Sequence, residues 1–244
     1  MIRAIFGLTL RQVAGRKSTV VLLLASLSPV VLALVFRFGE SEADPERWTA
    51  NVLLSGLVVR ALLPLVALFL GTSVMGNEIE DGTAVYLLTK PTPRWQIATA
   101  KLGVAWLVTT LLALPSAVVA AQIALEGGDG RIGLGFGVAI AAGGLAYCAV
   151  FQLISLVTSR ALVAGLAYVF LWEAVVSGIF TGTRILSVRH LTLGIADAIV
   201  TSPRSVFDSE MGAVLSVTAL IVATVTVSWL GVRRLEVFEV RETT

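Results

Sequence analysis

Long apolar runs separated by short polar segments make up most of this chain. Six runs are long enough to cross a membrane, because a hydrocarbon core of roughly 30 Å requires about 20 apolar residues in a helix. They cover about 18–36, 49–76, 98–125, 132–158, 161–181 and 213–231. The runs are continuous, whereas strands of a membrane barrel alternate over about ten residues. The pattern predicts an all-α integral membrane protein with six transmembrane helices in one domain, 1–244.

The segment 1–17 precedes the first run and has apolar positions at helical spacing. Its apolar residues are Ile2, Ile5, Phe6, Leu10 and Val13. Arg3 and Arg11 fall on another face of the same helix, which is typical of an amphipathic helix on a membrane surface. The alternative is a frayed, positively charged terminus.

The segment 182–212, between the fifth and sixth runs, mixes apolar and charged positions. Asp197 interrupts its apolar residues, which favours a re-entrant or surface helix, with a plain loop as the alternative. His190, the single histidine, has no second histidine or cysteine near it, so the segment predicts no metal site.

Composition agrees with the membrane assignment. Hydrophobic residues make up 57% of the chain, charged residues 14%, and the mean hydropathy is +0.91. A soluble domain of this size needs more polar residues for its surface. The net charge of +2 gives no reason to expect nucleic acid as a partner. Cys148 is the single cysteine, which excludes an internal disulfide.

Lysine and arginine are distributed unequally over the two sides of the six-span arrangement. With the N-terminus inside, eleven of them face the cytoplasm: Arg3, Arg11, Arg16, Lys17, Lys90, Arg94, Lys101, Arg160, Arg233, Arg234 and Arg241. Six face outward: Arg37, Arg47, Arg131, Arg184, Arg189 and Arg204. The positive-inside rule therefore predicts cytoplasmic termini in the cell membrane, with the loop 37–48 and the segment 182–212 outside.

The segment 77–101 lies between the second and third runs and is the longest polar stretch on the predicted cytoplasmic side. It carries six charges, two prolines and a Gly-Thr pair. Gly82 permits a tight turn, the following residues suit a short helix, and Pro91 and Pro93 interrupt it. A short helix held between two spans is suited to transmitting force from a soluble partner; an ordinary polar connector is the alternative.

The residues of this segment resemble the signature of ABC-2 type permeases, the membrane subunits of type V ATP-binding-cassette exporters. The resemblance rests on an acidic residue, a Gly-Thr, a Leu-Leu, a Pro-x-x-Arg and a lysine that enters the next span. These are Glu78, Gly82, Thr83, Leu87, Leu88, Pro91, Arg94 and Lys101. The length, six spans and N-terminal helix also resemble this family, including the branch with the NosY and gliding-motility permeases.

The resemblance implies a complex. Two permease chains, either two copies of this chain in a homodimer or this chain and a paralogue, are expected to pair within the membrane lipids. Cytoplasmic ABC ATPase subunits are expected to bind beneath them. The cytoplasmic coupling helix then lies in 77–101, and its ATPase-coupling residues are Glu78, Glu80, Asp81, Gly82, Thr83, Arg94 and Lys101. No P-loop occurs in the chain, because Asn77 follows Gly71 and Gly76 where a lysine is required. The chain is expected to be non-catalytic and free of cofactors, with ATP and Mg²⁺ bound by the partner.

Arg60 and Glu173 are the two ionisable residues placed well inside predicted spans. Counting about 1.5 Å per residue from the outer span ends puts both at similar depth. In the resembled family the second and fifth spans line the translocation route, which implies a charge pair within or between subunits. The alternative is that Arg60 reaches outward and Glu173 is protonated.

The spans contain no candidate catalytic residues, because an intramembrane enzyme needs paired carboxylates, a nucleophile with its base, or a metal site. The apolar spans favour export of an amphiphilic, lipid-like or drug-like substrate. The alternative is a mechanical coupler that passes ATP-driven motion to an extracytoplasmic partner, and this would require a docking surface such as 182–212.

Overall fold

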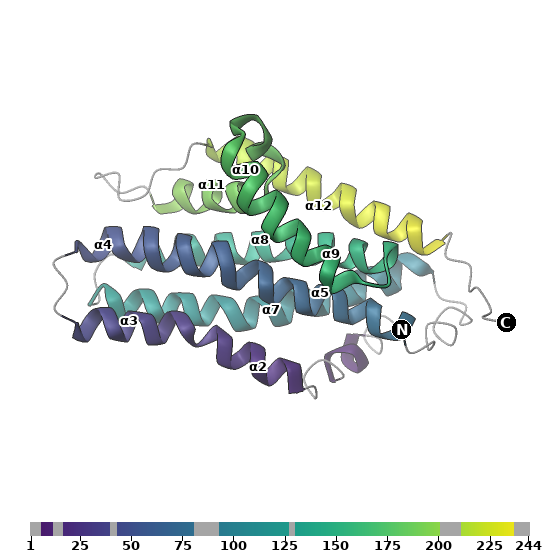
Figure 1. Ribbon diagram of the computed structural model, residues 1–244, viewed down its shortest axis with the longest axis horizontal. Helices are drawn as coiled ribbons and strands as arrows, with labels where there is room; N and C mark the ends of the chain where they lie inside the picture. Colours follow the sequence, from purple (N-terminus) through teal and green to yellow (C-terminus); the bar gives the residue numbers. More distant parts are fainter. Residues whose placement is uncertain are drawn as a thin grey trace.

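The computed structural model describes residues 6–11, 17–39, 43–80, 93–126, 130–200 and 211–236, and all regular structure within these ranges is helical. Six helical stretches are long and apolar enough to cross a membrane: Ser18–Phe38, Pro45–Gly76, Arg94–Ala124, Gly130–Val157, Ala161–Ile179 and Ala213–Leu235. The second, third and fourth spans run side by side along the long axis of the molecule, whereas the fifth span crosses that direction obliquely (Figure 1). The predicted fold class and the six spans are confirmed.

The first span consists of two helices, α2 (Lys17–Ser26) and α3 (Ser28–Phe38). The break falls at Leu27, and Pro29 occupies the first turn of α3, where its missing N–H breaks no helical bond. The Ser116 hydroxyl in the third span donates a hydrogen bond to the Ser26 carbonyl that the break leaves accessible. The kink is therefore stabilised by a neighbouring helix.

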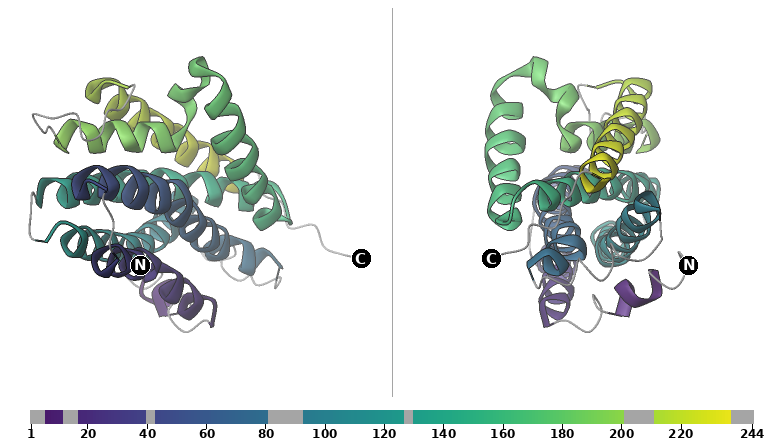
Figure 2. Two further views of the ribbon diagram at one scale, coloured as in Figure 1. Left: turned by 60° about the vertical axis from the view of Figure 1, so that its left-hand side comes forward. Right: turned by 90° about the vertical axis from the view of Figure 1, so that its right-hand side faces the viewer.

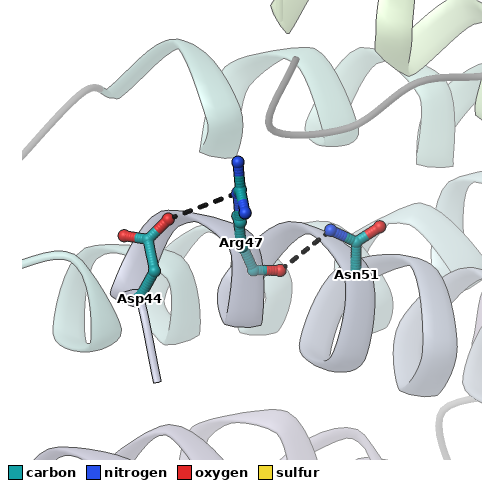
Figure 3. A network of polar contacts seen from close by, with 3 residues as sticks. All are labelled: Asp44, Arg47 and Asn51. Carbon is teal, nitrogen blue, oxygen red and sulfur yellow. Dashed lines mark hydrogen bonds and ion pairs between the residues drawn. The ribbon is translucent and has the colours of Figure 1, made fainter. Parts of the chain in front are cut away.

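The loop predicted at 37–48 is shorter than expected. The first span continues to Phe38, and α4 (Pro45–Trp48) begins the second span. Pro45 suits the first helical turn, and the carboxylate of Asp44 lies 3.7 Å from Nε of Arg47, one turn on (Figure 3). The rings of Phe36 and Trp48 stack at 3.8 Å across the hairpin. We call this end of the bundle the Trp48 end.

The second span continues as a π-helix, η1 (Thr49–Leu62), and then as α5 (Leu63–Glu80). The wider turn is visible where the N–H of Leu63 bonds to the carbonyl of Val58, five residues back. The π-helix ends at Leu62, two residues before Pro64, which has no N–H to donate. Arg60 lies in the last turn of this irregular segment.

The third and fourth spans, α7 (Arg94–Ala124) and α8 (Gly130–Val157), form the centre of the bundle with α5. Two faces of small residues on α8 allow close approach of two different neighbours. Gly133 and Gly137 face α7, while Gly135 and Gly143 face the helix that follows the fifth span. The small-residue pattern of this span thus serves helix packing. We call the end of the bundle where α7 begins the Arg94 end.

The fifth span contains a second π-helix. It is built from α9 (Ala161–Ala167), η2 (Tyr168–Val176) and α10 (Ser177–Ile179). A 3₁₀ turn, η3 (Thr181–Leu186), leads into α11 (Val188–Val200). The sixth span is α12 (Ala213–Glu236). Figure 2 shows α9 and α10 leaning away from the bundle, whereas α11 lies between α8 and α12.

The helix α11 lies in 182–212, where the sequence favours a re-entrant or surface helix over a plain loop, and the expected helix is present. It does not lie on the surface as an isolated helix, because it packs along α8 and α12. Its buried residues Val188, Leu191, Ile195 and Ala196 recur at helical spacing. Of the predicted helix at 1–17, the structure describes 6–11, which is helical. The centre of the predicted coupling insert, 81–92, lies outside the described residues.

Candidate functional site

A cavity of about 250 Å³ lies between the second span, the fifth span and α11. Its walls are Gly56, Arg60, Ala61, Leu65, Val169, Phe170, Glu173, Ala174 and Arg189. Both π-helices contribute, η1 through Arg60 and η2 through Glu173. Irregular turns of this kind are frequent at functional sites, because they reorient side chains that a regular helix would direct elsewhere.

Glu173 is buried, and its carboxylate accepts three hydrogen bonds from donors of its own chain. Tyr168 Oη donates to Oε1 at 2.9 Å, Ser187 Oγ donates to Oε2 at 2.5 Å, and the N–H of Val188 donates to Oε1 at 3.0 Å. Val188 is the first residue of α11, so the carboxylate caps this helix. Glu173 therefore ties the fifth span to α11.

Two arginines share the cavity with Glu173. Arg60 is exposed and Arg189 is partly buried, with Nε buried and without a hydrogen-bond partner among the described residues. Burial lowers the pKa of Arg189, and the charge of Arg60 lowers it further, which reflects their proximity. A guanidinium stays protonated in proteins, so the cavity holds two cations and one acid.

The structure brings Arg60 and Glu173 to one cavity, as their predicted depths suggest. Within the part of the chain that the structure describes, no ion pair joins them. A charge pair between Arg60 and Glu173 of two subunits stays a prediction. Sequence reasoning did not associate Arg189 with this site.

His190 adds a further polar contact beside the cavity. Its Nδ1 lies 2.9 Å from Ser187 Oγ. Because that hydroxyl donates to Glu173, it accepts from His190, which places the proton of the neutral ring on Nδ1. Burial and the charges of Arg189 and Arg184 lower the pKa of His190 to about 4. Among the described residues, no group of three histidine, cysteine, aspartate or glutamate side chains could hold a metal ion.

Part of the predicted ATPase-coupling set falls outside the described residues. Asp81, Gly82 and Thr83 belong to 81–92, and Glu78 and Glu80 lie in the last turn of α5, where the structure describes the backbone only. The coupling role of these residues stays a prediction.

Arg94 and Lys101, the other two residues of the predicted set, lie on α7 and hold neighbouring spans. The Arg94 guanidinium donates to the carbonyl of Leu235 in α12. Lys101 is fully buried, and its Nζ donates to the carbonyl of Val74 in α5 at 2.7 Å. Lys101 is therefore placed to act on α5 and not to touch a soluble partner directly.

A third polar bond completes this framework at the Arg94 end. The side chain of Gln152 in α8 donates from Nε2 to the carbonyl of Ala98 in α7 at 3.0 Å. Together the three bonds connect the start of α7 to α5, α8 and α12. Motion applied to the start of α7 would reach three other spans.

A comparison with protein-family models gives one assignment. The model described as "ABC-2 family transporter protein" matches residues 15–181, which is more than half of the chain. The matched part contains the first five spans and the segment 77–101. No curated protein matches the chain. The NosY and gliding-motility branch stays a prediction.

Proposed function

The chain belongs to the ABC-2 family of transporter proteins and is a membrane permease of an ABC transporter, and we propose that it exports an amphiphilic, lipid-like or drug-like substrate. The observation that carries the proposal is the cavity between the second and fifth spans. Most of its lining side chains are apolar, and three are charged. Pockets of mainly apolar walls with a few polar groups are typical small-molecule sites.

We infer that ATP and Mg²⁺ are bound by a separate cytoplasmic ATPase subunit, which grips 77–101. The chain lacks the P-loop lysine, so the nucleotide chemistry requires another polypeptide. The bonds of Arg94 and Lys101 support the proposal, because they give the start of α7 fixed connections to α12 and α5. Cytoplasmic termini in the cell membrane are part of this arrangement and rest on the positive-inside rule.

A second permease subunit is part of the proposal, either another copy or a paralogue. The fifth and sixth spans bury only 22% and 11% of their most apolar windows inside this chain. Exposed apolar residues such as Phe170, Leu171 and Trp229 lie on these spans. Lipid or a partner subunit covers such faces in a membrane.

The test starts from the complex that co-purifies with the full chain in mild detergent. After reconstitution into liposomes with a fluorescent short-chain lipid, ATP should move the lipid between leaflets, which a membrane-impermeant quencher detects. A complex with Glu80→Lys and Gly82→Val should form and hydrolyse ATP without moving the lipid. Absence of any ATPase subunit in the purified complex would refute the proposal.

The mechanical-coupler alternative gives a different result in the same assay. ATP hydrolysis would then proceed without lipid movement in the unaltered complex and would respond to an extracytoplasmic partner. Such a partner needs a docking surface, and α11 directs much of its apolar surface into α8 and α12. For this reason we favour export over mechanical coupling as the function.

A further inference from the structure

The cavity between η1, η2 and α11 has more positive charge than its own acid can neutralise. Arg60 and Arg189 both line it, and Glu173 supplies its carboxylate. That carboxylate already accepts hydrogen bonds from Tyr168, Ser187 and Val188. Its oxygens are therefore used to hold α11 in place, and the arginine donors are left over.

Neither guanidinium has a hydrogen bond or an ion pair with any described residue, and Nε of Arg189 is buried. A buried cationic donor without a partner, such as Nε of Arg189, is costly, and the two like charges on one cavity repel each other. An anion between them would relieve both costs. Arginine is also the side chain whose planar fork best fits a phosphate or carboxylate through two parallel bonds.

The remaining walls are apolar and indicate what else the ligand carries. Ala61, Leu65, Val169 and Phe170 contribute side chains without polar atoms. A volume of about 250 Å³ is below the roughly 300–1,000 Å³ of typical drug-sized pockets. Phe170 is 58% exposed at the cavity, and Leu171 beside it is 63% exposed. The cavity thus fits a headgroup, while an attached chain would extend along the exposed face of the fifth span.

We infer that this cavity binds the anionic headgroup of an amphiphile, a phosphate or carboxylate carrying an alkyl chain, through Arg60 and Arg189. The inference deepens the proposed function by naming the substrate class, and it rests on that function only for the claim that the bound molecule is then exported. Glu173 is a positioning residue: by capping α11 at Val188, it fixes the next residue, Arg189, at the cavity wall.

The test measures binding with the full chain alone, so that failure of transport does not affect it. The chain is placed in nanodiscs of zwitterionic phosphatidylcholine, and decyl phosphate, decanol and inorganic phosphate are compared by titration calorimetry. Decyl phosphate should bind, and decanol and inorganic phosphate should each bind at least about tenfold more weakly, because each lacks one half of the recognised chemistry. Equal binding of decanol, or equal binding of free phosphate, would overturn the inference.

Variants assign the effect to the two arginines. Arg60→Gln and Arg189→Gln should each weaken decyl phosphate binding about tenfold or more, which corresponds to loss of a charge-assisted hydrogen bond. Arg160→Gln removes an exposed arginine outside the cavity and should leave binding unchanged. Arg60→Lys and Arg189→Lys retain the charge, so they test the site if a glutamine variant fails to fold. Both lysine variants should bind decyl phosphate more weakly than the unaltered chain, because an ammonium group cannot form the two parallel bonds of a guanidinium.

Two results would overturn the assignment. One is that all arginine variants bind decyl phosphate as the unaltered chain does. The other is that Arg60→Gln leaves binding intact and dissociates a dimer in size-exclusion chromatography with light scattering, which would assign Arg60 to Glu173 of a second subunit.

Discussion

Lys101 Nζ donates a hydrogen bond to the backbone carbonyl of Val74 at 2.7 Å, and the lysine has no exposed surface. The bond joins the start of α7 to α5, so the two spans that flank the predicted coupling insert are held together at the Arg94 end. Because the buried ammonium group of α7 is bonded to a backbone carbonyl of α5, a displacement of one helix is passed to the other.

Replacing Lys101 separates packing from coupling. Lys101→Ala removes a large buried side chain and should lower the free energy of unfolding by about 2–5 kcal/mol, whereas Lys101→Met fills most of the space and should cost less than about 1.5 kcal/mol. Lys101→Met should still reduce substrate movement per ATP hydrolysed, since the bond to Val74 is lost. Thermal unfolding and the reconstituted transport assay measure the two effects. Normal coupling in Lys101→Met would mean that the lysine only fills space.

Gly143 is one of two glycines of α8, with Gly135, on which the close approach of α11 depends. A Cβ at this position would overlap Thr192 of α11, whereas a Cβ at Gly137 would meet Val118 at an ordinary 3.6 Å. Gly143→Ala should destabilise the chain by about 1–3 kcal/mol through overpacking, and Gly137→Ala should be close to neutral. Thermal unfolding in detergent measures both, and Thr192→Ala combined with Gly143→Ala should recover part of the loss. Equal effects of the two alanine variants would contradict the observed α8–α11 packing.

The sequence was sufficient for the spans because each is a long apolar run. Observed boundaries such as Arg94–Ala124 and Gly130–Val157 differ from the expected 98–125 and 132–158 by a few residues at most. The loop at 37–48 was predicted too long. Its bounds were taken from the charged residues, such as Asp44 and Arg47, although the helix of the second span already begins at Pro45. The two π-helices were not predicted, because residue periodicity over so few turns does not distinguish them from α-helix.

The candidate site was predicted only in part. Arg60 and Glu173 were identified because charges inside apolar runs are rare. Arg189 was counted only among the outward-facing charges of 182–212, and its place at the cavity depends on the fifth span ending at Ile179 and on α11 packing along α8. The spacing of Val188, Leu191 and Ile195 was a signal for that helix. No sequence pattern indicated which helix it would pack against.

His190 should make stability depend on pH in the acidic range. Its pKa falls to about 4 in the folded chain, from an ordinary value of about 6.5, so the unfolded chain binds more protons between these values. The contribution of His190 is fully present above pH 6.5, is lost as pH falls, and stays lost below about pH 4. Thermal unfolding between pH 7 and pH 4 should therefore decline more steeply for the unaltered chain than for His190→Gln. Identical pH profiles would show that the ring has no such role.

The last prediction concerns the orientation of the chain in the membrane. Asp44 is exposed at the Trp48 end, and Ser159 is exposed in the turn between the fourth and fifth spans. Three spans separate the two residues along the chain, so they face opposite sides of the membrane. The positive-inside rule places the first residue outside the cell and the second in the cytoplasm. In intact cells, an impermeant maleimide should label Asp44→Cys and should label Ser159→Cys only after permeabilisation. Cys148 is buried and serves as the internal background in the unaltered chain. The reverse labelling pattern would invert the topology and would place 77–101 on the wrong side of the membrane for an ATPase, so the same experiment decides whether the coupling proposal can stand.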